Sequence, residues 1–144
     1  MIALADSPID VAAVEASVRD PACGAVLVFV GTTRDTFDGR RVVRLEYEAY
    51  VALAQAEMMA IAREIAARWS GARVALVHRL GVVPVGEASV VIAVATPHRG
   101  DAYEASRHAI EALKARVPIW KKEVYDDGHA WRENVVNRRE EGGS

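Results

Sequence analysis

Residues 24–31 read GAVLVFVG, an uninterrupted apolar run of strand length that is rich in β-branched side chains. A run with no polar residue on either face is typical of a strand that is covered on both sides. We therefore expect a central buried strand here. The run ends in Thr32-Thr33-Arg34-Asp35, and the Asp38-Gly39 pair that follows indicates a turn.

Further strand signals lie on the C-terminal side of this run. Residues 43–50 alternate between apolar and polar side chains, which predicts a strand with one wet face. Two more apolar strands are expected at 73–80 and 88–96, joined by an irregular glycine- and proline-containing connection. Residues 119–125 and 129–134 predict a hairpin that closes around Asp126-Asp127-Gly128.

Three segments carry helix signals. Ser7-Pro8 has the N-cap and first-turn residues that favour a helix start. Residues 53–69 place apolar side chains on one face of a helix. Asp101 begins a capping-box pattern, so the last helix is expected from there to Val117, where Pro118 ends it.

The helices and strands alternate without a strict βαβ rhythm, which indicates an α+β fold. We predict one domain over residues 1–137, with mixed sheets and a C-terminal hairpin. The polar residues 138–144 are expected to form a disordered tail.

Composition restricts the possible functions. The chain has 144 residues and 51% hydrophobic residues, enough for one core. A formal net charge of −2 argues against a nucleic-acid or membrane-surface partner. No apolar run approaches the roughly 20 residues of a membrane span, and the N-terminus lacks a signal-peptide pattern, so a cytoplasmic protein is expected.

Metal and disulfide chemistry find no support in the sequence. The single cysteine, Cys23, excludes an internal disulfide and a cysteine-based metal cluster, and a structural role is expected for it. His78, His108 and His129 lack the spacing of metal ligands. We therefore predict neither a metal nor a resident cofactor.

Two basic sites are candidates for binding an anion. His98-Arg99 lies between a strand and a helix, where backbone N–H groups and the helix dipole favour a phosphate; a solvated turn is the alternative. Arg34 follows Gly31-Thr32-Thr33 and could supply a second contact, or it could simply mark the end of a strand.

Two lysines favour catalysis. Lys114 lies near the end of the last predicted helix, where a cation is also favourable for structural reasons. Lys121 and Lys122 are neighbours on a predicted strand and must point to opposite faces, so one can face a pocket. A partly desolvated amine beside other cations is suited to act as an acid, base or nucleophile.

The distance between these groups predicts an oligomer. His98 and Lys114 bracket a helix of about 16 residues, which at 1.5 Å per residue separates them by on the order of 20 Å. One small ligand cannot contact both within a single subunit. If both belong to one site, that site is shared between two subunits of a dimer.

Several separated motifs together resemble the MoaE family, the large catalytic subunits of molybdopterin synthase. The resemblance runs from Gly24 to about Trp131. The motifs that carry it are Phe29–Arg34 (FVGTTR), Leu45–Tyr50 (LEYEAY), His78–Gly81 (HRLG), Val85–Glu87 (VGE), His98-Arg99, Leu113-Lys114 and Pro118–Glu123 (PIWKKE).

The resemblance implies an α/β-hammerhead-like fold and a sulfur transfer. Sulfur would pass from the C-terminal thiocarboxylate of a small ubiquitin-like carrier subunit into cyclic pyranopterin monophosphate, forming the molybdopterin dithiolene. It also implies a homodimer within a heterotetramer. The residues carried over are catalytic Lys114 and Lys121, substrate-binding Thr32, Thr33, Arg34, His98, Arg99, Lys122 and Glu123, and pocket-lining Phe29 and Ile110.

The family pattern is not complete in this chain. Some members carry a second arginine shortly after the last tryptophan, where this chain has Glu133-Asn134-Val135, and Arg132 could compensate. Two other functions fit the residues. A non-catalytic module that binds a phosphorylated metabolite would need Arg34 and His98-Arg99 but not the lysines. A docking scaffold for a ubiquitin-like partner would tolerate the loss of His98.

Overall fold

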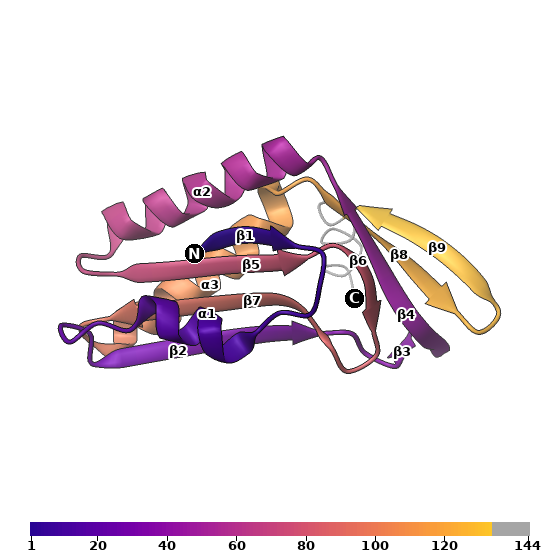
Figure 1. Cartoon of the computed structure of the whole chain (residues 1–144), viewed down its shortest axis with the longest axis horizontal. Helices are drawn as coiled ribbons and strands as arrows, with labels where there is room; N and C mark the ends of the chain where they lie inside the picture. Colours follow the sequence, from indigo (N-terminus) through magenta and orange to yellow (C-terminus); the bar gives the residue numbers. More distant parts are fainter. Residues whose placement is uncertain (134–144) are drawn as a thin grey trace.

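The computed structural model describes residues 1–133 (Figure 1). The predicted tail at 138–144 lies outside the described residues. Three helices and nine strands follow one another in this range: β1 Ile2–Ala5, α1 Val11–Val18, β2 Ala25–Thr32, β3 Thr36–Phe37, β4 Arg40–Ala49, α2 Val51–Arg68, β5 Arg73–Arg79, β6 Gly81–Pro84, β7 Ala88–Thr96, α3 Arg99–Arg116, β8 Ile119–Tyr125 and β9 Gly128–Glu133.

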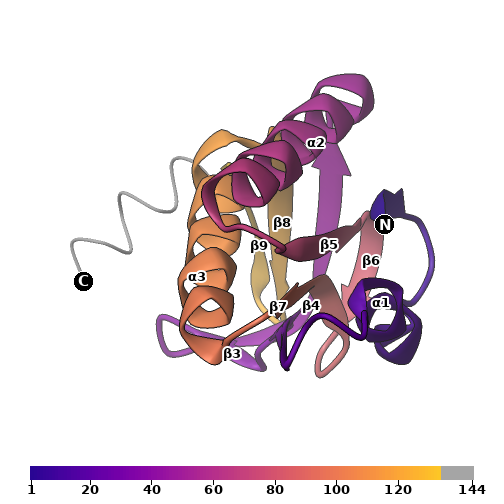
Figure 2. The ribbon, with the colours of Figure 1, turned by 90° about the vertical axis from the view of Figure 1, so that its left-hand side faces the viewer.

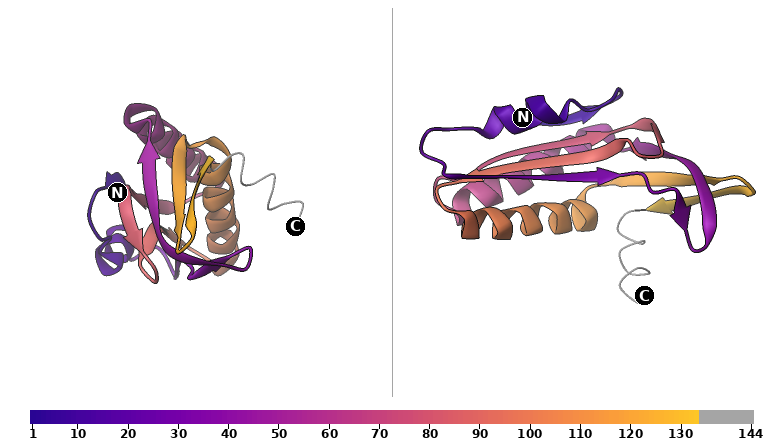
Figure 3. Two further views of the ribbon diagram at one scale, coloured as in Figure 1. Left: turned by 90° about the vertical axis from the view of Figure 1, so that its right-hand side faces the viewer. Right: turned by 90° about the horizontal axis from the view of Figure 1, so that it is seen from below.

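The first sheet is sandwiched between helices. Its strand order is β1-β5-β7-β2, with β1 parallel to β5 and the other pairs antiparallel. Helices α2 and α3 cover one face and α1 covers the other (Figures 1 and 3). Successive residues of β7 therefore enter different cores: Ile92 packs with the α2 and α3 side chains, and Ala93 packs with Val14 of α1.

The apolar run that begins at residue 24 forms β2, but the expectation of a central buried strand was wrong. Within residues 1–133, β2 pairs only with β7 and lies at an edge of the sheet, and Phe29 and Val30 are exposed. The run is apolar on both faces because α1 and α3 pack against them. The central position belongs to β7, which is buried from Ser89 to Thr96.

The second sheet extends away from the first (Figure 1). Strand β4 holds it together, because it pairs with β3, with β6 and with β8, and β8 pairs in turn with β9. The β8–β9 hairpin confirms the predicted C-terminal hairpin. The strand expected at 43–50 is also confirmed, although β4 starts three residues earlier, at Arg40.

Two helix starts differ from the sequence predictions. α1 begins at Val11 and not at Pro8, because Asp10 is the N-cap: its side chain accepts from the Ala13 N–H at 3.1 Å. α3 begins at Arg99, with His98 in the N-cap position, and Asp101 lies inside the first turn instead of capping it. The ends of α2 and α3 lie within two residues of the expected ones.

The strands β1 and β6 were not expected. β1 consists of four residues whose pairing with β5 joins segments far apart in the sequence. β6 occupies most of the connection that was expected to be irregular. Figure 2 shows α2 and α3 side by side on the same side of the first sheet. The α+β class with mixed sheets is confirmed, and no helix within residues 1–133 is long and apolar enough to cross a membrane.

Candidate active site

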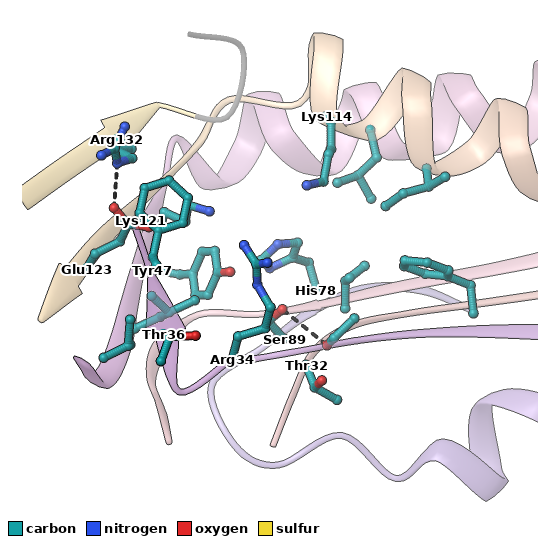
Figure 4. A pocket seen from close by; sticks show the side chains of 18 of the residues that line it. Thr32, Arg34, Thr36, Tyr47, His78, Ser89, Lys114, Lys121, Glu123 and Arg132 are labelled. Atoms are coloured by element: carbon teal, nitrogen blue, oxygen red, sulfur yellow. Dashed lines mark hydrogen bonds and ion pairs between the residues drawn. The ribbon is translucent and has the colours of Figure 1, made fainter. Parts of the chain in front are cut away.

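A pocket of about 630 Å³ opens where the two sheets meet the C-terminal half of α3 (Figure 4). Its walls come from the end of β2 and the loop after it, the β3–β4 hairpin, strands β5, β7, β8 and β9, and α3. It lies at a seam between both sheets and a helix, so residues distant in sequence are brought together there. A cavity of this size suits a small organic ligand.

The two candidate lysines face this pocket from opposite sides of a turn. α3 ends at Arg116, and Pro118 lies between the helix and β8. The chain therefore reverses from helix to strand between Lys114 and Lys121, and both line the pocket. Lys114 makes no hydrogen bond or ion pair within the described residues, which leaves its ammonium available to a ligand.

Lys122 points away from Lys121, as the strand alternation predicted. Its Nζ lies 5.6 Å from the centroid of the Trp131 ring, a cation–π distance, and it does not line the pocket. The pair therefore offers a matched comparison. Two lysines of one strand carry the same charge, and only one of them faces the cavity.

Two arginines and an aromatic ring form one wall. The Phe37 ring lies within cation–π distance of two guanidinium groups, with the Arg132 Cζ at 4.7 Å and the Arg34 Cζ at 6.0 Å from its centroid. Arg132 also pairs through Nε with the carboxylate of Glu123, which is almost fully buried and accepts a further hydrogen bond from the Tyr125 hydroxyl at 3.0 Å. The buried carboxylate thus holds Arg132 in place, and Phe37 bridges the two arginines.

Buried polar side chains line the pocket where it meets the first sheet. His78 on β5 packs edge-to-face against Tyr47 on β4, with ring centroids 4.9 Å apart. Burial raises the pKa of the Tyr47 phenol, and the Ser89 hydroxyl partly offsets this rise. Ser89 itself donates to the carbonyl of Gly31 at 3.3 Å. Burial is also the main cause that lowers the pKa of His78, to about 4.

The pocket gathers most of the residues predicted for the site. Those that line it are Phe29, Thr32, Arg34, Ile110, Lys114, Lys121 and Glu123. Thr33 and Lys122, both predicted to bind substrate, do not line it. The Thr33 side chain is buried and its hydroxyl donates to the Val83 carbonyl at 3.4 Å, and Lys122 lies near the Trp131 ring. His98 and Arg99 lie at the opposite end of α3 from Lys114 and do not line the pocket of the same subunit.

Sequence reasoning missed several residues of the site. Tyr47 and His78 lie within motifs of the family resemblance, but neither was predicted to line the site. Arg132 was only a possible substitute for a missing arginine. Phe37, Thr36 and Asp38 belong to the β3–β4 hairpin, where the sequence indicated only the turn at Asp38-Gly39.

Groups that could hold a metal ion were not found within residues 1–133, where no three His, Cys, Asp or Glu side chains cluster suitably. The site is instead rich in cations. Arg34, Lys114, Lys121 and Arg132 all line one cavity of a chain whose net charge is −2. Such a local concentration of positive charge favours an anionic ligand.

Comparison with known proteins defines the class. Residues 4–116 match the family of MoaE proteins. The molybdopterin synthase catalytic subunit of rice (Oryza sativa subsp. indica) is 57% identical over 88% of this chain and 65% of its own length. The zebra finch (Taeniopygia guttata) protein of the same name is 49% identical, over 92% of this chain and 86% of its own.

A solved structure supports the same assignment. A chain of molybdopterin synthase from Staphylococcus aureus superposes with a TM-score of 0.87 at 40% identity, covering 90% of this chain and 94% of that one. The chain therefore belongs to the MoaE family. It spans 65% of the length of the rice relative.

Proposed function

We propose that this chain is the catalytic subunit of a cytoplasmic molybdopterin synthase. In this proposal it transfers sulfur from the C-terminal thiocarboxylate of a small ubiquitin-like subunit into cyclic pyranopterin monophosphate, forming the dithiolene of molybdopterin. The observation that carries the proposal is the convergence of Lys114, Lys121, Arg34 and Arg132 on one pocket. Family membership supports it.

The pocket suits the two anions that this reaction brings together. A thiocarboxylate and a cyclic phosphate each carry negative charge, and arginine binds phosphate through a planar fork of N–H donors. We assign the phosphate to the arginine wall, because Glu123 pairs with Arg132 and the Phe37 ring lies within cation–π distance of both guanidinium groups.

The lysines are assigned to the sulfur transfer itself. Lys114 extends from α3 and Lys121 from β8, so a carbon atom between them can be approached from two sides (Figure 4). In our proposal one ammonium pairs with the thiocarboxylate, whose sulfur attacks a carbon of the pterin side chain, and the other donates a proton to the oxygen that leaves as the C–S bond forms. Water then cleaves the bond between the carrier's carbonyl carbon and the sulfur, which releases the carrier as a carboxylate. Two such transfers, each from one thiocarboxylate, supply the two sulfurs of the dithiolene.

We further propose that the functional unit contains a homodimer whose sites are shared. His98 and Arg99 lie close to the start of β2, because the Gly24 N–H donates to the Pro97 carbonyl at 3.2 Å. The end of β2 reaches the pocket, where Thr32 lines it. His98 is thus separated from the pocket of its own subunit by about the length of β2.

A second copy that pairs with the exposed edge of β2 can bring the His98 end of one subunit to the pocket end of the other. If two copies pair antiparallel along this edge about a two-fold axis, the start of one β2 lies beside the end of the other. His98 and Arg99 of one subunit would then approach the arginine wall of its partner. The exposed side chains of Phe29 and Val30 at this edge also favour a second copy there.

Reconstitution tests the reaction. The purified chain is mixed with a thiocarboxylated small subunit and cyclic pyranopterin monophosphate, and the dithiolene product is measured by mass spectrometry. Lys114→Ala and Lys121→Ala should each abolish product, while the matched variant Lys122→Ala retains it. Binding of both partners without any product in the wild type would instead favour a docking scaffold or a binding module.

Mixed dimers test the shared site. His98→Ala and Lys114→Ala chains are each expected to be inactive alone. After subunit exchange, half of the dimers contain one chain of each kind, and each of these has one intact site, so about a quarter of wild-type activity should return. A mixture that stays inactive although the exchange is demonstrated by mass would place every essential group within one subunit.

A further inference from the structure

One buried polar group of the pocket has no role in the sulfur transfer described above. His78 is 3% exposed and lies near the end of β5, on the face of the sheet that α3 covers. Figure 4 shows it beside Arg34, on the side of the pocket toward which Lys114 extends. Burying a polar imidazole costs free energy unless its nitrogens are hydrogen-bonded, so a buried histidine at the wall of a ligand cavity is a candidate for a ligand contact.

The hydrogen bond of one ring nitrogen determines the state of the other. His78 Nδ1 lies 2.8 Å from the carbonyl oxygen of Arg79. A carbonyl can only accept, so Nδ1 carries the hydrogen in this contact, and Nε2 of the neutral ring is left with a lone pair. Burial and repulsion from Lys114 lower the pKa of His78 to about 4, which keeps this neutral form dominant near neutral pH.

Nε2 is open to the pocket. It makes no hydrogen bond within residues 1–133. The one fully buried side-chain nitrogen or oxygen without a partner in that range is Nε of Arg79, so Nε2 of His78 is not fully buried. Because His78 lines the pocket, the surface through which Nε2 is reached is the pocket itself. The edge-to-face contact with Tyr47 fixes the plane of the ring.

The other polar groups around this nitrogen make it chemically distinct. Lys114, Lys121, Arg34 and Arg132 can only donate hydrogen bonds. The buried acceptors among the lining residues are engaged: Glu123 accepts from Tyr125 and from Arg132, and the Ser89 hydroxyl lies against Tyr47 and Gly31. A ligand that is anionic at one end and carries N–H groups at the other would match the cations with its charge and Nε2 with a donor.

We propose that His78 contacts the substrate, its Nε2 accepting a hydrogen bond from an N–H or O–H group of the bound pterin ring system. This inference rests on the proposed function, since it takes the cyclic pyranopterin as the ligand. His78 selects for a donor at that position, and it orients the pterin while the arginine wall holds the phosphate. Ligands with the same phosphate but without that donor lose the contact.

Two variants of His78 separate this role from a structural one. His78→Asn can keep an N–H donor near the position of Nδ1 and so retain the bond to Arg79, while it removes Nε2. His78→Gln can place an amide oxygen near the position of Nε2. His129→Asn, at an exposed residue of β9 outside the pocket, is the matched control.

The binding of cyclic pyranopterin monophosphate to each purified protein is measured by calorimetry, beside its melting temperature and its rate of product formation. His78→Asn should melt like the wild type and bind roughly 3- to 10-fold more weakly, as expected for one hydrogen bond. His78→Gln should recover part of this loss, and His129→Asn should match the wild type. In wild-type protein labelled with ¹⁵N-histidine, the Nε2 resonance should shift when substrate saturates the site.

Three results would overturn the inference or its basis, and they are distinguishable. Unchanged affinity in His78→Asn, with an active wild type, refutes the contact and leaves the proposed function intact. An Nε2 resonance that does not respond to saturating substrate refutes the contact even if the variants fail to fold. A wild type that does not bind the pterin at all refutes the proposed function and the contact together.

Discussion

Acidification should unfold this protein partly through His78. The folded chain keeps the ring neutral, because burial and the charge of Lys114 lower its pKa to about 4, against a smaller opposing effect of the bond to Arg79. In the unfolded chain the ring takes up a proton below its ordinary pKa of about 6.5. The stability that depends on the neutral ring is therefore complete above about pH 6.5 and is lost as the pH falls toward 4.

The size of this loss follows from the two pKa values. Proton uptake by the unfolded chain alone should remove about 2 kcal/mol of the free energy of unfolding between pH 7.5 and 5, and on the order of 3 kcal/mol by pH 4. A final pH of 5 isolates the effect best. The pKa values of Glu64 and Asp127 are lowered by their arginine partners, so those carboxylates still carry their charge there.

The assay is urea unfolding followed by tryptophan fluorescence, at pH 7.5 and pH 5 and at one protein concentration, because dissociation of an oligomer would also change the midpoint. His78→Asn is the reference, since it cannot take up this proton. The wild type should lose about 2 kcal/mol more than the variant between the two pH values. Equal losses in the two proteins would show that His78 is not held neutral by the fold.

Three further perturbations test the core and the arginine wall. Ile65→Ala, at a fully buried position of α2, should lower the free energy of unfolding by roughly 2–5 kcal/mol, and a loss below about 1 kcal/mol in urea unfolding would contradict the packing. Glu123→Gln removes the carboxylate partner of Arg132 and should cost roughly 3 kcal/mol. It should also lower the pKa of Tyr125, which burial and Glu123 raise, and an ultraviolet titration that matches the wild type would argue against this network. Phe37→Leu should leave the melting temperature nearly unchanged and raise KM roughly 3-fold, because two guanidinium groups lose their aromatic contact; an unchanged KM in the product assay would refute a positioning role.

The course of β2 shows what the sequence could and could not predict. Its apolar run correctly predicted a strand, and α1 and α3 pack against its faces, but the expected burial was wrong because Phe29 and Val30 remain exposed. Whether the backbone edge of a strand is paired depends on the rest of the sheet, and that information is absent from the run itself. β1 was missed for a related reason: four residues carry little pattern, and their partner strand lies about 70 residues further along the chain.

The candidate site divides in the same way. Lys114 and Lys121 were predictable as neighbours, because a helix that must end before Pro118 returns as a strand within a few residues. His78 and Tyr47 were not, because their proximity depends on the packing of β4 against β5 across two sheets. A histidine in an apolar strand is more often structural than functional, and only the cavity next to it distinguishes the two cases.

The polar residues of the proposed site fall into three groups, and each group reaches the site in a different way. The lysines meet through one local turn. The arginines and His78 meet when two sheets fold against each other, and they supply the charge and a buried open acceptor for a ligand that carries both a phosphate and N–H groups. In the proposed dimer, His98 and Arg99 would reach such a ligand from a second copy that pairs along the edge of β2. Loss of dimer contacts at this edge should therefore weaken substrate binding while the pocket of each subunit stays folded. A monomeric variant that keeps full activity would exclude a shared site.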